Sequence, residues 1–385
     1  MHILVIPSWY PSPISPISGI FAKQQLEALA RRGHQIGVIS SILSRTGFPS
    51  LEEKISQPEY TLMQGSFRNR FPLLFGSTGY FWVKNGYEMY AEYVKNYGTP
   101  DLIHAHSSLY AGVLAAKINK AHHIPYVLTE HSSYVTRKDI SSWNVPRVKR
   151  AFLRANINIA VSNFVKEEIV RKYVISPENW RVIPNMVGSH FFERTPTPLA
   201  GENFIFTNIG GLVDVKAQNV LLEALAICTN DHHSTIKLRI IGDGPNREQL
   251  KAQSKDLGIE RHVEWIQQVE PHSLPDVIAN SQVIISSSST ETFGLTLAES
   301  LAVGRPVLST NSGGPADIIT DEVGIMVEKN DPVKLADAMK EMVKNIGKYP
   351  IDALKRYAQE NFHEQVVMEQ IEDCYQTALD GGNRT

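Results

Sequence analysis

Short apolar segments rich in β-branched residues alternate with longer helical patterns along almost the whole chain of 385 residues. In the first half, the predicted strands are residues 3–6, 36–40, 102–105, 125–129 and 157–161. Helical spacing follows the first of them, in Ala22, Leu26 and Leu29 before Gly33. Such alternation is typical of an α/β fold with a parallel sheet, because parallel strands need a crossover that places helices on both faces.

A second strand–helix series begins after an irregular stretch at residues 185–203 that contains Pro196, Pro198 and two glycines. Its predicted strands are residues 204–206, 238–241, 263–266, 283–285 and 306–308. We interpret the irregular stretch as a linker between two domains, 1–187 and 188–362, followed by a helical pattern from residue 363. Two doubly wound domains of this kind are expected to face each other across a ligand-binding cleft.

Composition restricts the classes of partner. Lys and Arg total 38 against 40 Asp and Glu, so no overall positive charge favours nucleic acid. The two cysteines, Cys228 and Cys374, provide no disulfide framework, as expected in a reducing compartment. The start of the chain does not resemble a signal peptide, and no apolar run approaches the roughly 20 residues that span a bilayer. We therefore expect a cytoplasmic protein whose membrane contact, if any, is peripheral.

Two stretches of the first domain leave alternatives open. Residues 42–98 are irregular and contain Phe67, Arg68, Arg70, Phe71, Phe75, Tyr80, Phe81 and Trp82. They form either a loop and helix packed on the domain or a surface for an acceptor or a membrane. The basic stretch Arg147, Lys149, Arg150 and Arg154 is either a solvated helix face or a contact with anionic lipid.

The segment from Glu291 to Glu299 carries the most specific chemistry. Glu291 follows a predicted strand and a serine run, and Glu299 lies on a predicted helix, from about residue 293 to 303, that is otherwise almost entirely apolar. A buried carboxylate is unfavourable unless it is hydrogen-bonded, and a ribose diol supplies two hydroxyl donors. The helix start between the two carboxylates offers free amides at Gly294 and Leu295 to a diphosphate. The alternative is an ion pair between Glu299 and Arg305.

These residues resemble the GT-B-fold retaining glycosyltransferases of family 4, which have this Glu-x7-Glu segment. The matching stretches are Glu291 to Glu299, residues 304–307 (Gly-Arg-Pro-Val) and residues 313–315 (Gly-Gly-Pro). The resemblance implies two Rossmann-like domains, with the helix at 363–385 packed back onto the first. It also implies that Phe293, Gly294, Leu295 and Glu299 contact the donor, and that Glu291 orients the transferred sugar.

Further positions match the same family. Lys216 stands where relatives place a phosphate-binding lysine before a helix, whereas their nearby arginine is Gly211 here. Arg247 is a possible substitute, and Lys216 on motif alone is equally consistent with a solvated lysine. Gln268 and Val269 align with the loop that holds the base in relatives, although an ordinary polar loop is the alternative.

The first domain contributes two more candidates. Gly19, in the sequence Ser-Gly-Ile-Phe, resembles the family's glycine loop near the donor phosphates. His131 ends a predicted strand where relatives place a histidine beside the sugar, and it either donates a hydrogen bond there or is a structural residue. His106 is a weaker candidate on a neighbouring strand.

The sequence therefore predicts a retaining glycosyltransferase that needs no cofactor. Glu291, His131 and Lys216 are the predicted catalytic residues, and no Asp-x-Asp pair suggests a metal. The predicted donor is a UDP-sugar, with GDP-mannose as an alternative, and the acceptor a saccharide or a lipid-linked sugar of surface polysaccharide synthesis. An epimerase of the same fold and a non-catalytic nucleotide-sugar-binding subunit remain as alternatives.

Overall fold

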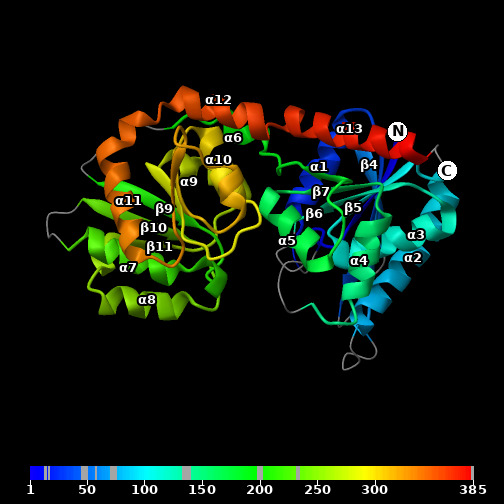
Figure 1. Ribbon diagram of the computed structural model, residues 1–385, viewed down its shortest axis with the longest axis horizontal. Coiled ribbons are helices and arrows are strands. Elements are labelled where there is room, and N and C mark those ends of the chain that lie inside the picture. The colour runs from blue at the N-terminus through cyan, green and yellow to red at the C-terminus, as the bar shows by residue number, and fades with distance from the viewer. Residues whose placement is uncertain are drawn as a thin grey trace. The chain divides into compact units, whose positions relative to one another are not determined.

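The computed structural model describes residues 1–12, 15, 18–44, 51–56, 59–69, 76–131, 140–196, 203–230 and 235–382. The chain divides into two compact units, each with its own sheet and core. Unit 1 comprises Met1–Met186 and Gln365–Thr385, and unit 2 comprises Val187–Glu364. Both are α/β units of the Rossmann-like kind that the strand–helix alternation predicts (Figure 1).

The sheet of unit 1 has the order β3-β4-β2-β1-β5-β6-β7-β8, in which only the β3–β4 pair is antiparallel among the described residues. Its strands are β1 (His2–Pro7), β2 (Gln35–Leu43), β3 (Leu51–Ser56), β4 (Glu59–Phe67), β5 (Leu102–His106), β6 (Tyr126–Glu130), β7 (Ile157–Ala160) and β8 (Trp180–Val182). The helices of this unit are α1 (Ile20–Arg31), α2 (Ser77–Tyr97), α3 (Val113–His122), α4 (Val145–Arg154), α5 (Asn163–Tyr173) and α13 (Glu364–Gly382).

One core of unit 1 lies between the sheet and helices α1 and α13. Leu26 and Leu29 of α1 pack with Ile3 and Val5 of β1, and Tyr375 of α13 is fully buried in the same cluster. Helix α3 contacts both α2 and α4, and the three helices form a separate layer in the same unit (Figure 1). A helix that comes late in the sequence therefore completes the core of the first unit.

Residues 42–98 correct one prediction. Helix α2 is the predicted helix, but the part expected to be a loop contains strands β3 and β4. The polar or small residues Gln64, Gly65 and Ser66 obscure the strand pattern of β4, although Gln64 is 3% exposed and donates to the Pro11 carbonyl at 3.0 Å. Arg70, Phe71 and Phe75 lie outside the described residues.

The sheet of unit 2 is parallel, with the order β11-β10-β9-β12-β13-β14. Its strands are β9 (Phe204–Ile209), β10 (Ile236–Ile241), β11 (Val263–Ile266), β12 (Val283–Ser286), β13 (Val307–Thr310) and β14 (Gly324–Val327). The helices are α6 (Ser189–Glu193), α7 (Gln218–Cys228), α8 (Arg247–Asp256), α9 (Leu274–Ala279), α10 (Leu295–Val303), α11 (Pro332–Asn345) and α12 (Ile351–Phe362).

A local signal explains where α11 begins. Asp331 caps α11, because its side chain accepts hydrogen bonds from the amides of Val333 and Lys334.

Helix α7 packs with α8 and α11, whereas α10 packs with α6, α9 and α12 (Figure 1). Among the described residues, none of the helices combines the length and apolar character needed to cross a bilayer.

Candidate functional site

The strand order of unit 2 has a switch point between β9 and β12. The chain runs outward from β9 through β10 to β11, then returns to pair β12 with the other side of β9. Loops that follow these two central strands diverge and leave a ligand site at the carboxyl edge of the sheet. Lys216 lies on the loop after β9, and Glu291 lies on the loop after β12.

An ion pair joins the two loops across this switch point. The Lys216 amine lies 2.5 Å from a carboxylate oxygen of Glu291, and the two side chains are 30% and 19% exposed. Ser287 Oγ donates to the Lys216 carbonyl at 2.9 Å, and the Ser289 amide donates to the Val215 carbonyl at 2.8 Å. The ion pair is thus held by backbone contacts between loops 75 residues apart in sequence, and it remains within reach of a ligand.

The Gly-Gly-Pro loop fixes the position of Glu291. The Glu291 amide donates to the Ser312 carbonyl at 2.9 Å, and the Gly314 amide donates to the Glu291 carbonyl at 2.8 Å. A Cβ atom on Gly314 would lie 2.5 Å from the Cα of Phe293, so any larger residue would displace this backbone. Glycine at 314 therefore allows the two loops to pair.

Helix α10 begins two residues later than the sequence suggested. Gly294 has φ +103° and precedes the helix, a conformation that few other residues tolerate. Among the described residues, nothing accepts from the amides of Gly294, Leu295 and Thr296, which are therefore available to an anion. Phe293 is 2% exposed and packs edge-on against Phe362, so only its backbone is placed to contact a ligand.

Glu299 is almost completely buried on α10, with 8% of its surface exposed. Burial raises the pKa of its carboxyl group to about 8. Within the described part of the chain, no side chain or backbone group donates to it. The alternative ion pair with Arg305 is therefore not formed, and Arg305 donates to the Ala279 carbonyl. A buried acceptor without a protein donor is suited to a ligand that brings hydroxyl groups.

This chain has Gly211 where the resembled family places a second cation near Lys216, and the space beside its Cα is open. A Cβ atom added there would have the Asp243 carbonyl oxygen, 3.9 Å away, as its nearest neighbour among the described residues. Arg247 donates to the Gly242 carbonyl at 2.8 Å. Lys329, which the sequence analysis did not single out, donates to the Ser289 carbonyl at 3.1 Å and thus lies near the Glu291 loop.

The glycine turn after β10 is structural. An added Cβ on Gly242 would lie 2.0 Å from the Gly210 carbonyl oxygen, and one on Gly244 would lie 2.4 Å from that of Leu212. Gln268 is exposed and Val269 half-buried on the loop that follows β11. Both follow a strand end at the same carboxyl edge of the sheet, because β9, β10 and β11 are parallel.

His131 lies in unit 1, where protein groups occupy both of its ring nitrogens. Nδ1 is 3.0 Å from Asn185 Oδ1, and Nε2 is 3.0 Å from Nδ1 of His106. Because the Asn185 oxygen can only accept, Nδ1 carries the proton and Nε2 accepts from His106. If the bond to His106 opened, Nε2 would accept from a sugar hydroxyl, whereas the predicted donation from His131 would also require the proton to move from Nδ1 to Nε2.

Burial keeps this histidine cluster neutral. It lowers the pKa of His131 to about 4 and that of His104 to about 3, and it also lowers the pKa of His106 well below its usual value. His104 bonds to Tyr375 of α13 at 2.6 Å and to Thr129 at 2.8 Å. The cluster is thus built from neighbouring strand ends and a distant helix.

Three further residues lie at this edge of unit 1. Gly19 precedes α1 with φ +69°, and an added Cβ would lie 2.0 Å from the Trp9 carbonyl oxygen, so glycine is required there. Phe21, on the first turn of α1, packs against His131 with ring centroids 4.3 Å apart. Glu130 is fully buried and accepts from the Ser108 amide at 2.8 Å, a role its position in an apolar strand did not reveal.

No group of three His, Cys, Asp or Glu side chains in the described residues has an arrangement suited to a metal ion. The positive groups at the edge of unit 2 include Lys216 and the free amides at the start of α10. This arrangement supplies a cation, anion-binding amides and two carboxylates at the edge of one sheet.

Two family models match the chain in succession. The model for glycosyltransferase family 4 matches residues 18–189, and that for glycosyl transferases group 1 matches residues 190–361. Together they extend over most of both units.

Individual relatives are more distant. The TuaC protein of Bacillus subtilis, a glycosyltransferase assigned to teichuronic acid biosynthesis, is 25% identical over 99% of this chain and 95% of its own. A D-inositol 3-phosphate glycosyltransferase of Acidothermus cellulolyticus is 28% identical over 65% of this chain and 61% of its own.

Solved structures share the fold. Sucrose-phosphate synthase from Thermosynechococcus elongatus has a TM-score of 0.81 at 19% identity, covering 99% of this chain and 100% of that chain. Anabaena HepE in complex with UDP-glucose has a TM-score of 0.72 at 19% identity, and the match covers 98% of this chain and 100% of that chain. With the two family models, these findings show that the chain belongs to the group 1, family 4 glycosyltransferases with the GT-B fold.

Proposed function

We propose that this glycosyltransferase uses a UDP-sugar as donor, retains the anomeric configuration and needs no metal ion. The observation that carries the proposal is the buried carboxyl group of Glu299, which has no protein donor in the described residues and lies one helix turn beyond free amides. The complexes of HepE with UDP and UDP-glucose support uracil as the base. GDP-mannose is the alternative donor.

The ribose of the donor would bind to Glu299. Two hydroxyl groups donating to one carboxylate form charge-assisted bonds, each contributing about 1.5–3 kcal/mol. Binding in the ionised form also releases the proton that burial holds on this carboxyl group. Gln268 and Val269 on the neighbouring loop would contact the base.

The diphosphate would bind at the start of α10 and beside Lys216. Departure of the nucleoside diphosphate places negative charge on the β-phosphate and positive character on the anomeric carbon. Amides of Gly294 and Leu295 and the Lys216 amine would stabilise the leaving group without a metal, so transfer should persist in EDTA. Gly19 remains a proposed phosphate contact from unit 1.

Glu291 would orient the sugar through its hydroxyl groups. In the unliganded protein its carboxylate is held by Lys216, so a donor exchanges this ion pair for one contact to phosphate and another to sugar. The acceptor oxygen then bonds to the anomeric carbon from the face that the phosphate leaves, and its proton passes to the departing phosphate. His131 is proposed to contact the sugar once its bond to His106 opens.

The acceptor is proposed to be a saccharide or a lipid-linked sugar in surface polysaccharide synthesis. The similarity to TuaC over nearly the full length of both chains supports this setting. Product analysis with acceptor panels identifies the linkage. Epimerised donor formed without acceptor would instead favour an epimerase, and binding without transfer or donor hydrolysis would favour a non-catalytic subunit.

The donor site is tested by comparing UDP with 2′-deoxy-UDP in thermal-shift and calorimetric titrations. We expect the wild type to bind UDP more tightly than 2′-deoxy-UDP by on the order of 10-fold, because the deoxy compound lacks one charge-assisted hydrogen bond. Glu299→Gln should bind UDP at least about 10-fold more weakly and discriminate little between the two nucleotides.

Glu360→Gln, an exposed residue on α12, is the matched control and should behave as the wild type. Equal discrimination by the wild type and Glu299→Gln would remove Glu299 from the ribose site. Stronger stabilisation by GDP or ADP than by UDP would overturn the assignment of the base.

A further inference from the structure

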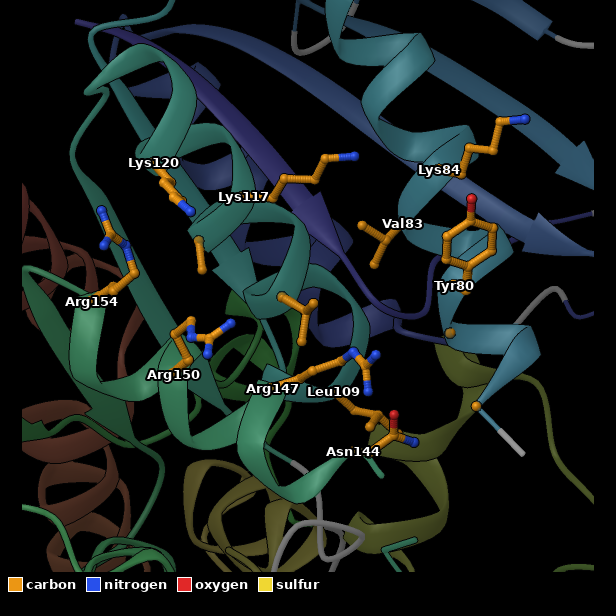
Figure 2. Close-up of a pocket in the computed structure, with 14 residues that line it drawn as sticks. Tyr80, Val83, Lys84, Leu109, Lys117, Lys120, Asn144, Arg147, Arg150 and Arg154 are labelled. Carbon is orange, nitrogen blue, oxygen red and sulfur yellow. The ribbon is translucent and has the colours of Figure 1, made fainter. Parts of the chain in front are cut away.

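A basic groove on unit 1 is separate from every residue placed in the proposed donor site. Helices α2, α3 and α4 enclose a cavity of about 350 Å³, a size within the range of small-ligand sites. Figure 2 shows its lining, with Arg147, Arg150 and Arg154 on α4, and Lys84 with Tyr80 on α2. We call it the cationic groove, defined by its basic residues Lys84, Lys117, Lys120, Arg147, Arg150 and Arg154.

Most of these charges have no counter-charge. Lys84 lies 3.8 Å from Glu88, whereas the other five basic side chains form no ion pair with any described residue. No Asp or Glu is among the described residues that line the cavity. The whole chain has a net charge of −2, so this accumulation of positive charge is local. Like charges gathered this closely repel one another unless an anion binds among them.

The side chains are also arranged around apolar surface. Val83, Leu109, Val113 and Ala116 line the cavity between the basic residues. Arg147 is held in place by its bond to the Trp143 carbonyl and by the Trp143 ring, 4.6 Å from its guanidinium carbon. A ligand of this groove should therefore combine negative charge with an apolar part.

Large apolar side chains are exposed on the same helices and beside them. Tyr80 on α2 is 66% exposed, Trp143 just before α4 is 56% exposed, and Leu153 on α4 is 58% exposed. Trp143 adjoins the groove, because an added Cβ on Gly76, which lines the cavity, would lie 2.2 Å from its ring. Tryptophan and tyrosine beside lysine and arginine are characteristic of surfaces that lie at a membrane interface.

We propose that the cationic groove binds the phosphate of an anionic phospholipid and docks unit 1 on a negatively charged membrane. The basic side chains would surround the phosphate, the apolar lining would contact the glycerol and upper acyl carbons, and Tyr80 and Trp143 would lie at the interface. The surface deepens the proposed function, since a lipid-linked acceptor would be reached there, but its binding test needs no turnover.

A lipid fits the groove better than two other anions. A soluble phosphate would use the charges but gain nothing from the apolar lining or from the exposed Trp143 and Leu153. A nucleic acid would need a positively charged track for successive phosphates, whereas these six basic residues surround one cavity.

The test measures partition of the full-length protein onto vesicles of phosphatidylcholine with or without about 30% phosphatidylglycerol. We expect binding only to the anionic vesicles, with loss at high salt because the interaction is largely ionic. The double variant Lys120→Gln/Arg150→Gln should lower the partition coefficient by on the order of 25-fold, roughly five-fold for each basic residue. Neither residue makes a hydrogen bond or ion pair with another described side chain, so the fold should be retained.

The matched control is Lys95→Gln/Lys166→Gln, which removes the same charge elsewhere on unit 1 and should partition like the wild type. Brominated lipid should quench tryptophan fluorescence more strongly in the wild type than in Trp143→Phe, since Trp143 is 56% exposed, Trp82 and Trp180 are each only 3% exposed, and Trp9 and Trp265 are only partly exposed. Both double variants should bind UDP as the wild type does, which separates this proposal from that of the donor site.

Three results would overturn the proposal. They are equal binding to neutral and anionic vesicles, unchanged partition of the Lys120→Gln/Arg150→Gln variant, and groove-dependent binding of glycerol 3-phosphate or single-stranded RNA without vesicle binding.

Discussion

The carboxyl edges of the two sheets use ionisable groups in opposite ways. In unit 2, Lys216 and Glu291 are charged, partly exposed and paired with each other, so a ligand can exchange their contacts. In unit 1, His106 and His131 are neutral and bonded to protein groups. The edge of unit 2 can therefore bind a charged ligand by exchanging its ion pair, whereas the histidines at the edge of unit 1 already have protein partners. From this difference we expect unit 2 to stabilise the charge that develops in the proposed reaction. We also expect pH to change the stability of the two units in opposite directions.

The largest expected effect is the acid sensitivity of unit 1. The pKa values of His104 and His131 are lowered to about 3 and about 4, so the unfolded chain binds protons below pH 6.5 that the folded chain does not. The free energy of unfolding should therefore fall as the pH drops from 6.5, by on the order of 5 kcal/mol at pH 4.5 for His104 and His131, and His106 acts in the same direction. Denaturant titrations at pH 7 and 4.5 measure this loss.

His131→Gln should lose less stability on acidification than the wild type, because one of the three imidazoles is gone. His123→Gln, at an exposed position after α3, is the control and should show the wild-type loss. If the free energy of unfolding of His131→Gln fell as much between pH 7 and pH 4.5 as that of the wild type, His131 would not contribute to the acid sensitivity of unit 1.

Unit 2 should respond in the other direction. The pKa of Glu299 is raised to about 8, so the folded protein keeps a proton that the unfolded chain releases above pH 4.5. The free energy of unfolding without ligand should fall by on the order of 4 kcal/mol from pH 5 to pH 9. Glu299→Gln, which cannot ionise, should be more stable than the wild type at pH 9. A wild-type alkaline slope in that variant would refute the assignment.

Activity should depend most on the cation of unit 2. Lys216→Ala should lower transfer by on the order of 100-fold, about 2.7 kcal/mol, because the leaving phosphate loses its point charge. Steady-state kinetics with a UDP-sugar test this, with Lys344→Ala in the last turn of α11 as the control that removes a lysine elsewhere in the same unit. Turnover like that of the wild type in Lys216→Ala would remove Lys216 from the mechanism.

The smallest expected effect is a gain. Gly211 is exposed, and a Cβ there would meet only the Asp243 carbonyl among the described residues, so Gly211→Arg should fold normally. A second cation near the diphosphate should tighten UDP binding by roughly five-fold, about 1 kcal/mol at this exposed position. The effect should be smaller for Gly211→Gln, which adds length without charge. Equal affinities of the two variants would show that position 211 does not face the phosphates.

The sequence predicted the central strands of both sheets because they are continuous apolar runs. It missed β4, whose buried Gln64 and neighbouring Ser66 interrupt the run, and it missed the short strands β8 and β14. A buried polar residue is recognised only when its partner is known, and the Pro11 carbonyl that accepts from Gln64 lies 53 residues away.

The candidate site was predicted residue by residue but not as a set of contacts. The motif singled out Lys216 and Glu291, yet their ion pair depends on the strand order, which brings loops 75 residues apart to one switch point. Likewise, the sequence predicted His131 as a hydrogen-bond donor to a sugar, but it gave no sign of the contacts with His106 and Asn185 that occupy both ring nitrogens. Residue types identify chemistry, whereas the fold decides which groups are free to perform it.

The position of α13 has a consequence for biogenesis. Tyr375 of this helix bonds to His104 and fills the core beneath β1 and β5, yet the ribosome synthesises all of residues 187–364 before it. The core of residues 1–186 therefore remains uncovered on the nascent chain until α13 has been synthesised. Unit 2, in contrast, contains all of its own strands in one uninterrupted stretch. Cotranslational folding should thus complete the second unit of the sequence before the first.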